Sequence, residues 1–66
     1  MTGEQLKEAR LEMKYTQQRL GELLGFTGRN AELMIQHWEH NRRNIPLRYY
    51  RKISEILEIP LESMIP

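Results

Sequence analysis

Two histidines and two serines are among the side chains of this 66-residue sequence that could support metal binding or catalysis. His37 and His40 are three residues apart, so both could touch one metal ion if they lie on a helix. The sequence has no cysteine and no third ligand at a useful spacing. Ser54 and Ser63 have no histidine nearby in the sequence, and no glycine-rich phosphate loop or nucleophile elbow occurs. We therefore expect no metal ion, no cofactor and no enzymatic activity.

Base recognition in DNA is a second kind of chemistry, and the middle of the sequence could support it. Arg29 could form a bidentate pair with guanine, whereas Asn30 and Gln36 could each pair with adenine. Leu33 could pack on a thymine methyl group, and His37 follows directly after Gln36. Such side chains read DNA only when one element presents them together in a groove. Whether these side chains can recognise bases therefore depends on the helices that carry them.

The charges are unevenly distributed, although the formal net charge is only +1. Residues 1–26 carry four basic and four acidic side chains. Residues 27–52 carry six basic and two acidic side chains, which gives this segment a net charge of +4. Residues 53–66 carry three glutamates and no basic residue. A basic middle segment of this kind indicates a surface that faces a polyanion.

Two amphipathic helices are predicted in the first 25 residues. Thr2 and Gln5 match a capping box, in which each side chain satisfies a backbone N–H of the other, so the first helix begins at Thr2. Thr16 is a good N-cap for the second helix, and Gly25 ends it as a left-handed C-cap would. The residues that recur at helical spacing and face inward are Leu6, Ala9, Arg10 and Met13, then Leu20, Leu23 and Leu24.

Three further helices are predicted in the rest of the chain. A helix is expected from Gly28 or Arg29 to about His40, and Thr27 can cap it. Pro46 suits the first position of a fourth helix, and Pro60 starts a short fifth one. The inward-facing residues are Ala31, Met34 or Ile35, and Trp38 in the third helix, and Leu47, Tyr50, Ile53, Ile56 and Leu57 in the fourth. The fifth helix carries the apolar residues Leu61, Met64 and Ile65, of which part must cover the core.

The order of these motifs resembles a known family. The pattern Thr-Gln-x-x-Leu-x-x-x-Leu-Gly at residues 16–25 is followed by Ile-x-x-Trp-Glu at residues 35–39, a polar loop and Ile-Pro. Over residues 3–65 this resembles the lambda-repressor/Cro (xenobiotic-response-element-like) helix-turn-helix family. The resemblance implies an all-α, five-helix DNA-binding domain over residues 1–66. It also implies that the second and third helices bind DNA and that the protein is a homodimer on a palindromic operator.

The resemblance also implies roles for individual residues. Gln17 matches a position that contacts phosphate at the start of the second helix, and Gln18 lies beside it. Arg10 and Glu39 match positions that form a largely buried ion pair. The remaining predicted DNA contacts are Arg29, Asn30, Leu33, Gln36 and His37 on the third helix, and Asn41, Arg42 and Arg43 in the loop that follows it, against the sugar-phosphate backbone.

The sequence departs from the family pattern at two places. Gly21 stands where the family usually has alanine, which costs about 0.5–1 kcal/mol of helix propensity. The segment between Gly25 and Trp38 is about four residues longer than in the family, which is close to one helical turn. We expect these residues to lengthen the recognition helix at its N-terminus or to enlarge the turn before it.

The expected function is that of a sequence-specific transcriptional regulator, a small Cro-like or phage or mobile-element repressor. The apolar C-terminal residues could form its dimer seam. An alternative is an antitoxin-like or other protein-interaction module, because Leu33, Met34 and Ile35 are three adjacent apolar residues on a helix expected to read DNA. No small-molecule ligand is expected. No apolar run approaches the roughly 18–20 residues of a membrane span, and the polar start is unlike a signal peptide, so a soluble, cytoplasmic protein complete from Met1 is expected.

Overall fold

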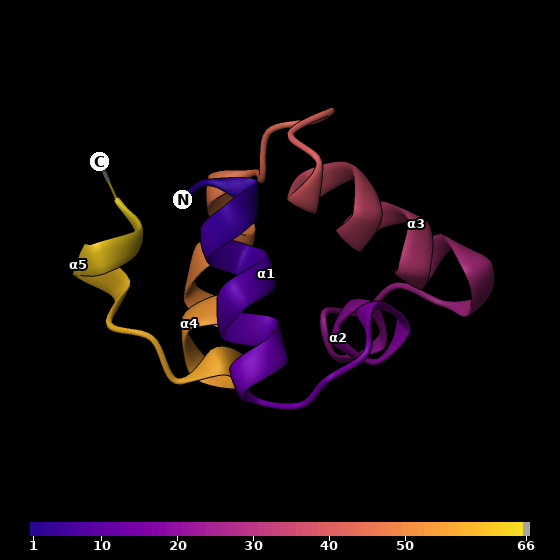
Figure 1. Cartoon of the computed structure of the whole chain (residues 1–66), viewed down its shortest axis with the longest axis horizontal. Coiled ribbons are helices and arrows are strands. Elements are labelled where there is room, and N and C mark those ends of the chain that lie inside the picture. Colours follow the sequence, from indigo (N-terminus) through magenta and orange to yellow (C-terminus); the bar gives the residue numbers. More distant parts are fainter. Residues whose placement is uncertain (66) are drawn as a thin grey trace.

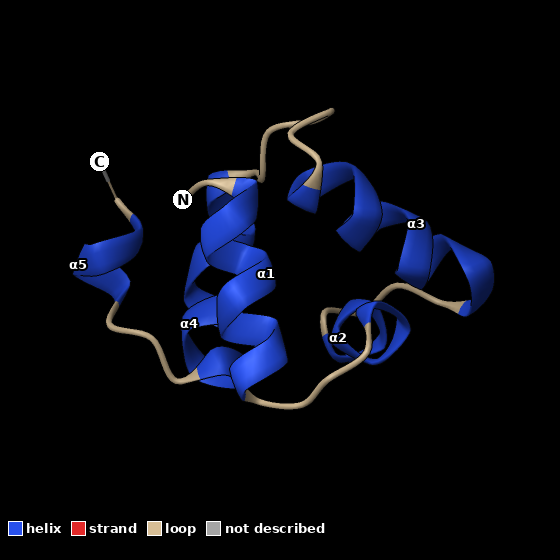
Figure 2. Ribbon diagram, in the orientation of Figure 1, coloured by secondary structure: helices blue, strands red, loops and turns tan. Residues whose placement is uncertain are grey.

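The computed structural model describes residues 1–65, and all the regular structure in that range is helical (Figures 1 and 2). The predicted five α-helices are confirmed, with one short 3-10 helix in addition. The elements are α1 (Gly3–Glu12), α2 (Gln17–Leu23), α3 (Gly28–Glu39), η1 (Leu47–Tyr49), α4 (Tyr50–Leu57) and α5 (Leu61–Met64). Within residues 1–65, no helix combines the length and the apolar character required to cross a membrane.

The first two helices begin at the caps that the sequence predicts. The backbone N–H of Gln5 donates to Thr2 Oγ1 at 3.1 Å, and the N–H of Thr2 donates to Gln5 Oε1 at 2.8 Å, which completes the capping box. The hydroxyl of Thr16 accepts from the N–H of Arg19 at 3.0 Å. Each cap satisfies donors that a helix start would otherwise leave unpaired.

The turn between α2 and α3 is short, and α3 is long. Gly25 has a φ of 101°, and the N–H of Phe26 donates to the Gly21 carbonyl at 3.0 Å, so the predicted left-handed cap is confirmed. Helix α3 starts at Gly28 and spans 12 residues, so the additional residues belong to the helix and the turn is not enlarged. Thr27 occupies the N-cap position, but its side chain makes no capping hydrogen bond.

The start of the fourth helix differs from the prediction. Pro46 has a ψ of 141°, so it precedes the helical segment and does not occupy its first position. The 3-10 helix η1 follows, and α4 begins only at Tyr50. The reason is tertiary packing, because η1 places the Tyr49 ring against two other aromatic rings. Its centroid lies 5.3 Å from that of Trp38 and 5.5 Å from that of Phe26. Leu47, predicted to face inward, is 73% exposed.

The core lies where α1, α2, α3 and α4 meet and extends under α5. Its buried members are Leu6, Leu20, Leu24, Ile35, Trp38, Ile45, Ile53, Leu57 and Met64. In Figure 1, α2 and α3 lie to one side of α1, and α5 lies on the other side. Helices α2 and α3 pack closely against each other, so the third helix is held against the second with its other face left toward solvent.

Candidate nucleic-acid interface

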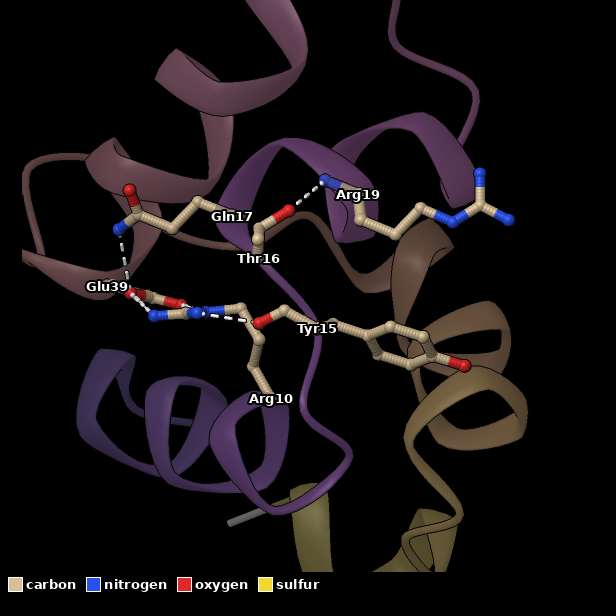
Figure 3. A network of polar contacts seen from close by, with 6 residues as sticks. All are labelled: Arg10, Tyr15, Thr16, Gln17, Arg19 and Glu39. Carbon is tan, nitrogen blue, oxygen red and sulfur yellow. Dashed lines mark hydrogen bonds and ion pairs between the residues drawn. The ribbon is translucent and has the colours of Figure 1, made fainter.

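A buried ion pair joins the end of α3 to α1. Arg10 Nε lies 2.6 Å from Glu39 Oε2, and Arg10 Nη2 donates to Glu39 Oε1 at 3.1 Å. The third guanidinium nitrogen donates to the Tyr15 carbonyl at 2.9 Å. Both charged residues are only 7% exposed. This bidentate arrangement fits the planar guanidinium and compensates the loss of water around both charges (Figure 3).

Gln17 extends the same network to α2. Its side-chain amide nitrogen donates to Glu39 Oε1 at 3.0 Å (Figure 3). The start of α2 and the last turn of α1 are therefore both bound to one carboxylate at the end of α3. Gln17 is the first residue of α2 and was predicted to contact phosphate. In this structure its amide group points into the protein and positions α2 against α3. Gln18 is exposed, and its amide donates to Glu22 Oε2 at 3.3 Å.

The face of α3 that points away from the core carries most of the predicted base-reading residues. Arg29, Leu33 and Gln36 recur at helical spacing, opposite the buried residues Ala31 and Ile35. Arg29 is exposed, whereas Leu33 and Gln36 are half-buried. These three predicted residues therefore share one side of a single helix.

The other predicted residues on α3 lie beside this face. Asn30 is exposed and His37 is half-buried, and both lie toward the same edge of the helix. His40 was not among the predicted DNA contacts, but it is exposed and follows Gln36 by four residues. The i, i+4 spacing from Gln36 could have placed His40 on the same side as Gln36 from the sequence alone.

The loop after α3 is fixed at its start and basic beyond it. Asn41 adopts a left-handed conformation with a φ of 57°, and its side-chain oxygen accepts from the Gly3 N–H at 3.1 Å. The N–H of Arg42 donates to the His37 carbonyl at 2.9 Å. The side chains of Arg42 and Arg43 are exposed. Asn41 thus anchors the loop on α1, while the two arginines remain available to a polyanion.

The apolar run Leu33–Ile35 does not form an exposed patch. Ile35 is fully buried, and Met34 is half-buried and packs against the core. Only Leu33 of the three lies on the outward face. Packing in the core therefore accounts for Met34 and Ile35, two of the three adjacent apolar residues that favoured a protein-interaction module over a DNA-binding protein.

Groups that could support metal chemistry do not gather in the part of the chain that the structure describes. Among residues 1–65, no cluster of three or more histidine, cysteine, aspartate or glutamate side chains is placed to hold a metal ion. Two ion pairs occur in the same range, the buried Arg10–Glu39 pair and an exposed Arg19–Glu22 pair at 3.7 Å.

The comparisons with known proteins agree with this arrangement. A family model described as Helix-turn-helix (HTH_3) matches residues 6–64, which is most of the chain. No curated protein and no solved structure gives a match. The matched range contains all five α-helices except the start of the first one. The chain therefore belongs to the lambda-repressor/Cro-like helix-turn-helix family of DNA-binding transcription regulators.

Proposed function

We propose that this protein is a repressor that binds an operator in duplex DNA, with α3 in the major groove. The observation that carries the proposal is the outward face of α3, where Arg29, Leu33 and Gln36 lie in line while the opposite face is buried. A major groove about 12 Å wide admits one α-helix, and it presents a different pattern of donors, acceptors and methyl groups for each base pair. A helix with this face can use hydrogen bonds and one apolar contact in the same groove.

Each side chain on this face has a preferred target. Arg29 is suited to guanine O6 and N7, and Gln36 is suited to adenine N6 and N7. Leu33 lies between them on the helix and can contact a thymine methyl group. Asn30 and His37 flank this line and extend the set of donors and acceptors. These contacts would supply the sequence preference.

Contacts with phosphate would position the protein without reading the sequence. Arg42 and Arg43 follow α3 directly and are exposed, so they are the best-placed cations beside the proposed reading helix. The start of α2, with Gln17 and Gln18, would lie across the backbone as in other proteins of this architecture. Because the Gln17 amide is bound to Glu39, its part in this contact is to hold the start of α2 in place.

A dimer follows from the same proposal. A helix-turn-helix dimer binds two half-sites about one helical turn apart, so its operator reflects the two-fold symmetry of the protein. Apolar residues remain accessible near the C-terminus, where Ile65 is 54% exposed and Leu61 and Ile59 are half-buried. Selected DNA sites should therefore be palindromic. A single half-site bound by one protein chain would contradict the dimer.

The proposal is tested by selecting duplexes from a randomised DNA pool and then measuring the affinity for single-base variants of the selected site by fluorescence anisotropy. Arg29→Ala and Gln36→Ala should each reduce discrimination at one base pair by about 1–3 kcal/mol. Lys7→Ala removes an exposed charge from α1 and should leave the preference unchanged. Equal binding to unrelated duplexes at low salt would contradict sequence-specific recognition.

A further inference from the structure

A groove lies between α1 and the C-terminal part of the chain. Its volume is about 280 Å³, and it is open to solvent. Helix α1 lines it with Gln5, Glu8, Ala9 and Glu12, whose i, i+3, i+4, i+7 spacing places them on one face of the helix. Pockets for small molecules usually measure about 300–1,000 Å³ and enclose most of their ligand. A smaller, open groove is better matched to a few side chains of another polypeptide.

The inner surface of the groove is apolar. Ala9 and Ile59 both line it, are half-buried and pack against the core. Met64, which also lines it, is itself a core residue and only 2% exposed. Apolar side chains that entered the groove would leave water and contact the edge of the core. The groove therefore favours an occupant with an apolar face.

The polar side chains that line the groove differ in whether they already have partners. Gln5 accepts a hydrogen bond from the backbone of its own cap, and Ser63 donates one to a nearby carbonyl, each at 2.8 Å. Glu8 and Glu12 are exposed and belong to neither of the two ion pairs found within residues 1–65. The two carboxylates are therefore the charged groups that can pair with an occupant.

Both carboxylates stand where a negative charge weakens α1. Glu8 and Glu12 are four residues apart, where like charges on a helix repel each other. Glu12 is also the last residue of α1, where the helix dipole disfavours a negative charge. A positive charge beside them would offset both effects. Two carboxylates are too few for Ca²⁺, which takes about six to eight oxygen ligands, so the matching cations are basic side chains.

We propose that this groove binds a basic amphipathic helix of a partner protein. The apolar face of that helix enters the groove, and two basic side chains four residues apart pair with Glu8 and Glu12, which are separated by about 6 Å along α1. A second copy of this chain is a poor occupant, because residues 53–66 carry three glutamates and no basic residue, and like charges across an interface repel.

The groove and the proposed reading face are separate surfaces. In Figure 1, α5 lies on the other side of α1 from α2 and α3, and none of the residues that line the groove belongs to α2 or α3. A partner bound in the groove therefore leaves α3 accessible to DNA. The inference does not depend on the proposed function, because it uses none of the proposed DNA contacts.

The test begins with a displayed library of helices about 14 residues long, a length at which a helix can form in water. Apolar residues are fixed at i, i+3, i+4 and i+7, and the other positions are randomised. Helices selected on the full chain should carry two basic residues four positions apart. A synthetic, fluorescently labelled copy of the most enriched helix is then the probe, and its affinity is measured by fluorescence anisotropy.

Charge reversal on α1 should weaken binding of this probe. Glu8→Lys and Glu12→Lys should each lower its affinity by about tenfold, because an attractive pair becomes a repulsive one. A probe with glutamate in place of the matching basic residue should regain affinity for the variant, which a merely structural effect could not produce. Glu55→Lys is the matched control, because it changes the net charge equally at an exposed site on α4 that does not line the groove.

Several results would overturn the inference. One is a selection that recovers no helix, or only helices without basic residues. Another is a probe whose affinity is the same for Glu8→Lys and Glu12→Lys as for the wild-type protein. Sedimentation that shows self-association of the chain to be lost in Glu8→Lys would instead assign the groove to a second copy. Failure of the wild-type protein to select a DNA site would refute the proposed function and leave the binding of the probe unaffected.

Discussion

At the scale of single residues, one buried carboxylate organises the candidate site. Glu39 accepts from Arg10 of α1 and from Gln17 of α2, while it belongs to α3. A buried charge is tolerated only when its partners replace the water that it loses. The relative position of the three helices therefore depends on this group.

Replacing Glu39 by alanine should strongly destabilise the protein. The Arg10 guanidinium would stay buried without its counter-charge, and breaking a buried pair in this way costs roughly 3–5 kcal/mol. Urea unfolding followed by circular dichroism measures the loss. Glu22→Ala is the control, because the Arg19–Glu22 pair is exposed and such surface pairs contribute about 0–1 kcal/mol. Similar losses in the two variants would show that Glu39 is not a structural centre.

At the scale of elements, the helices differ in how their first turns are stabilised. The Thr16 hydroxyl caps α2 through the Arg19 N–H, whereas the side chain of Thr27 makes no such bond at the start of α3. The helix proposed to read DNA is therefore well packed from Ala31 onward and weakly held before it.

The two threonines provide a matched comparison of the caps. Thr16→Ala should lower the free energy of unfolding by about 1 kcal/mol, because one backbone N–H loses its partner. Thr27→Ala should change it little, since its side chain makes no capping bond. Equilibrium unfolding of both variants under identical conditions gives the comparison. An equal loss in Thr27→Ala would mean that its hydroxyl caps α3 in solution.

At the scale of the whole molecule, the charge distribution supports one DNA-facing side. The segment 27–52 is basic and the segment 53–66 is acidic, although the chain as a whole is nearly neutral. Arg42 and Arg43 lie in the loop directly after the proposed reading helix and are exposed. Phosphate neutralisation releases counterions, so the affinity of such a surface depends on salt.

The salt dependence of binding should identify the residues that contact phosphate. Replacing Arg42 and Arg43 by alanine should reduce the slope of log affinity against log salt concentration by about 0.9 for each phosphate that is no longer neutralised. The preferred sequence should stay the same, because phosphate contacts carry no base information. Titrations between low and physiological salt give the slopes, with Lys7→Ala as the control. An unchanged slope would place both arginines outside the interface.

The features that could be predicted from the residues alone are those governed by neighbours along the chain. The caps at Thr2 and Thr16 and the left-handed turn at Gly25 join groups only a few residues apart, so their residue types and spacing are sufficient. The same holds for the outward line of Arg29, Leu33 and Gln36, because helical periodicity places them on one side. Their contacts with DNA remain predictions.

The features that depend on distant groups could be established only from the packing of the folded chain. Tyr49 packs on Trp38 and Phe26, and the chain therefore forms η1 after Pro46 and delays the fourth helix. Gln17 turns inward because Glu39, 22 residues later, offers it an acceptor. The backbone of Ala31 packs directly against Gly21. In each case the partner is farther along the chain than a local pattern extends, so residue spacing alone does not reveal that the two groups are close.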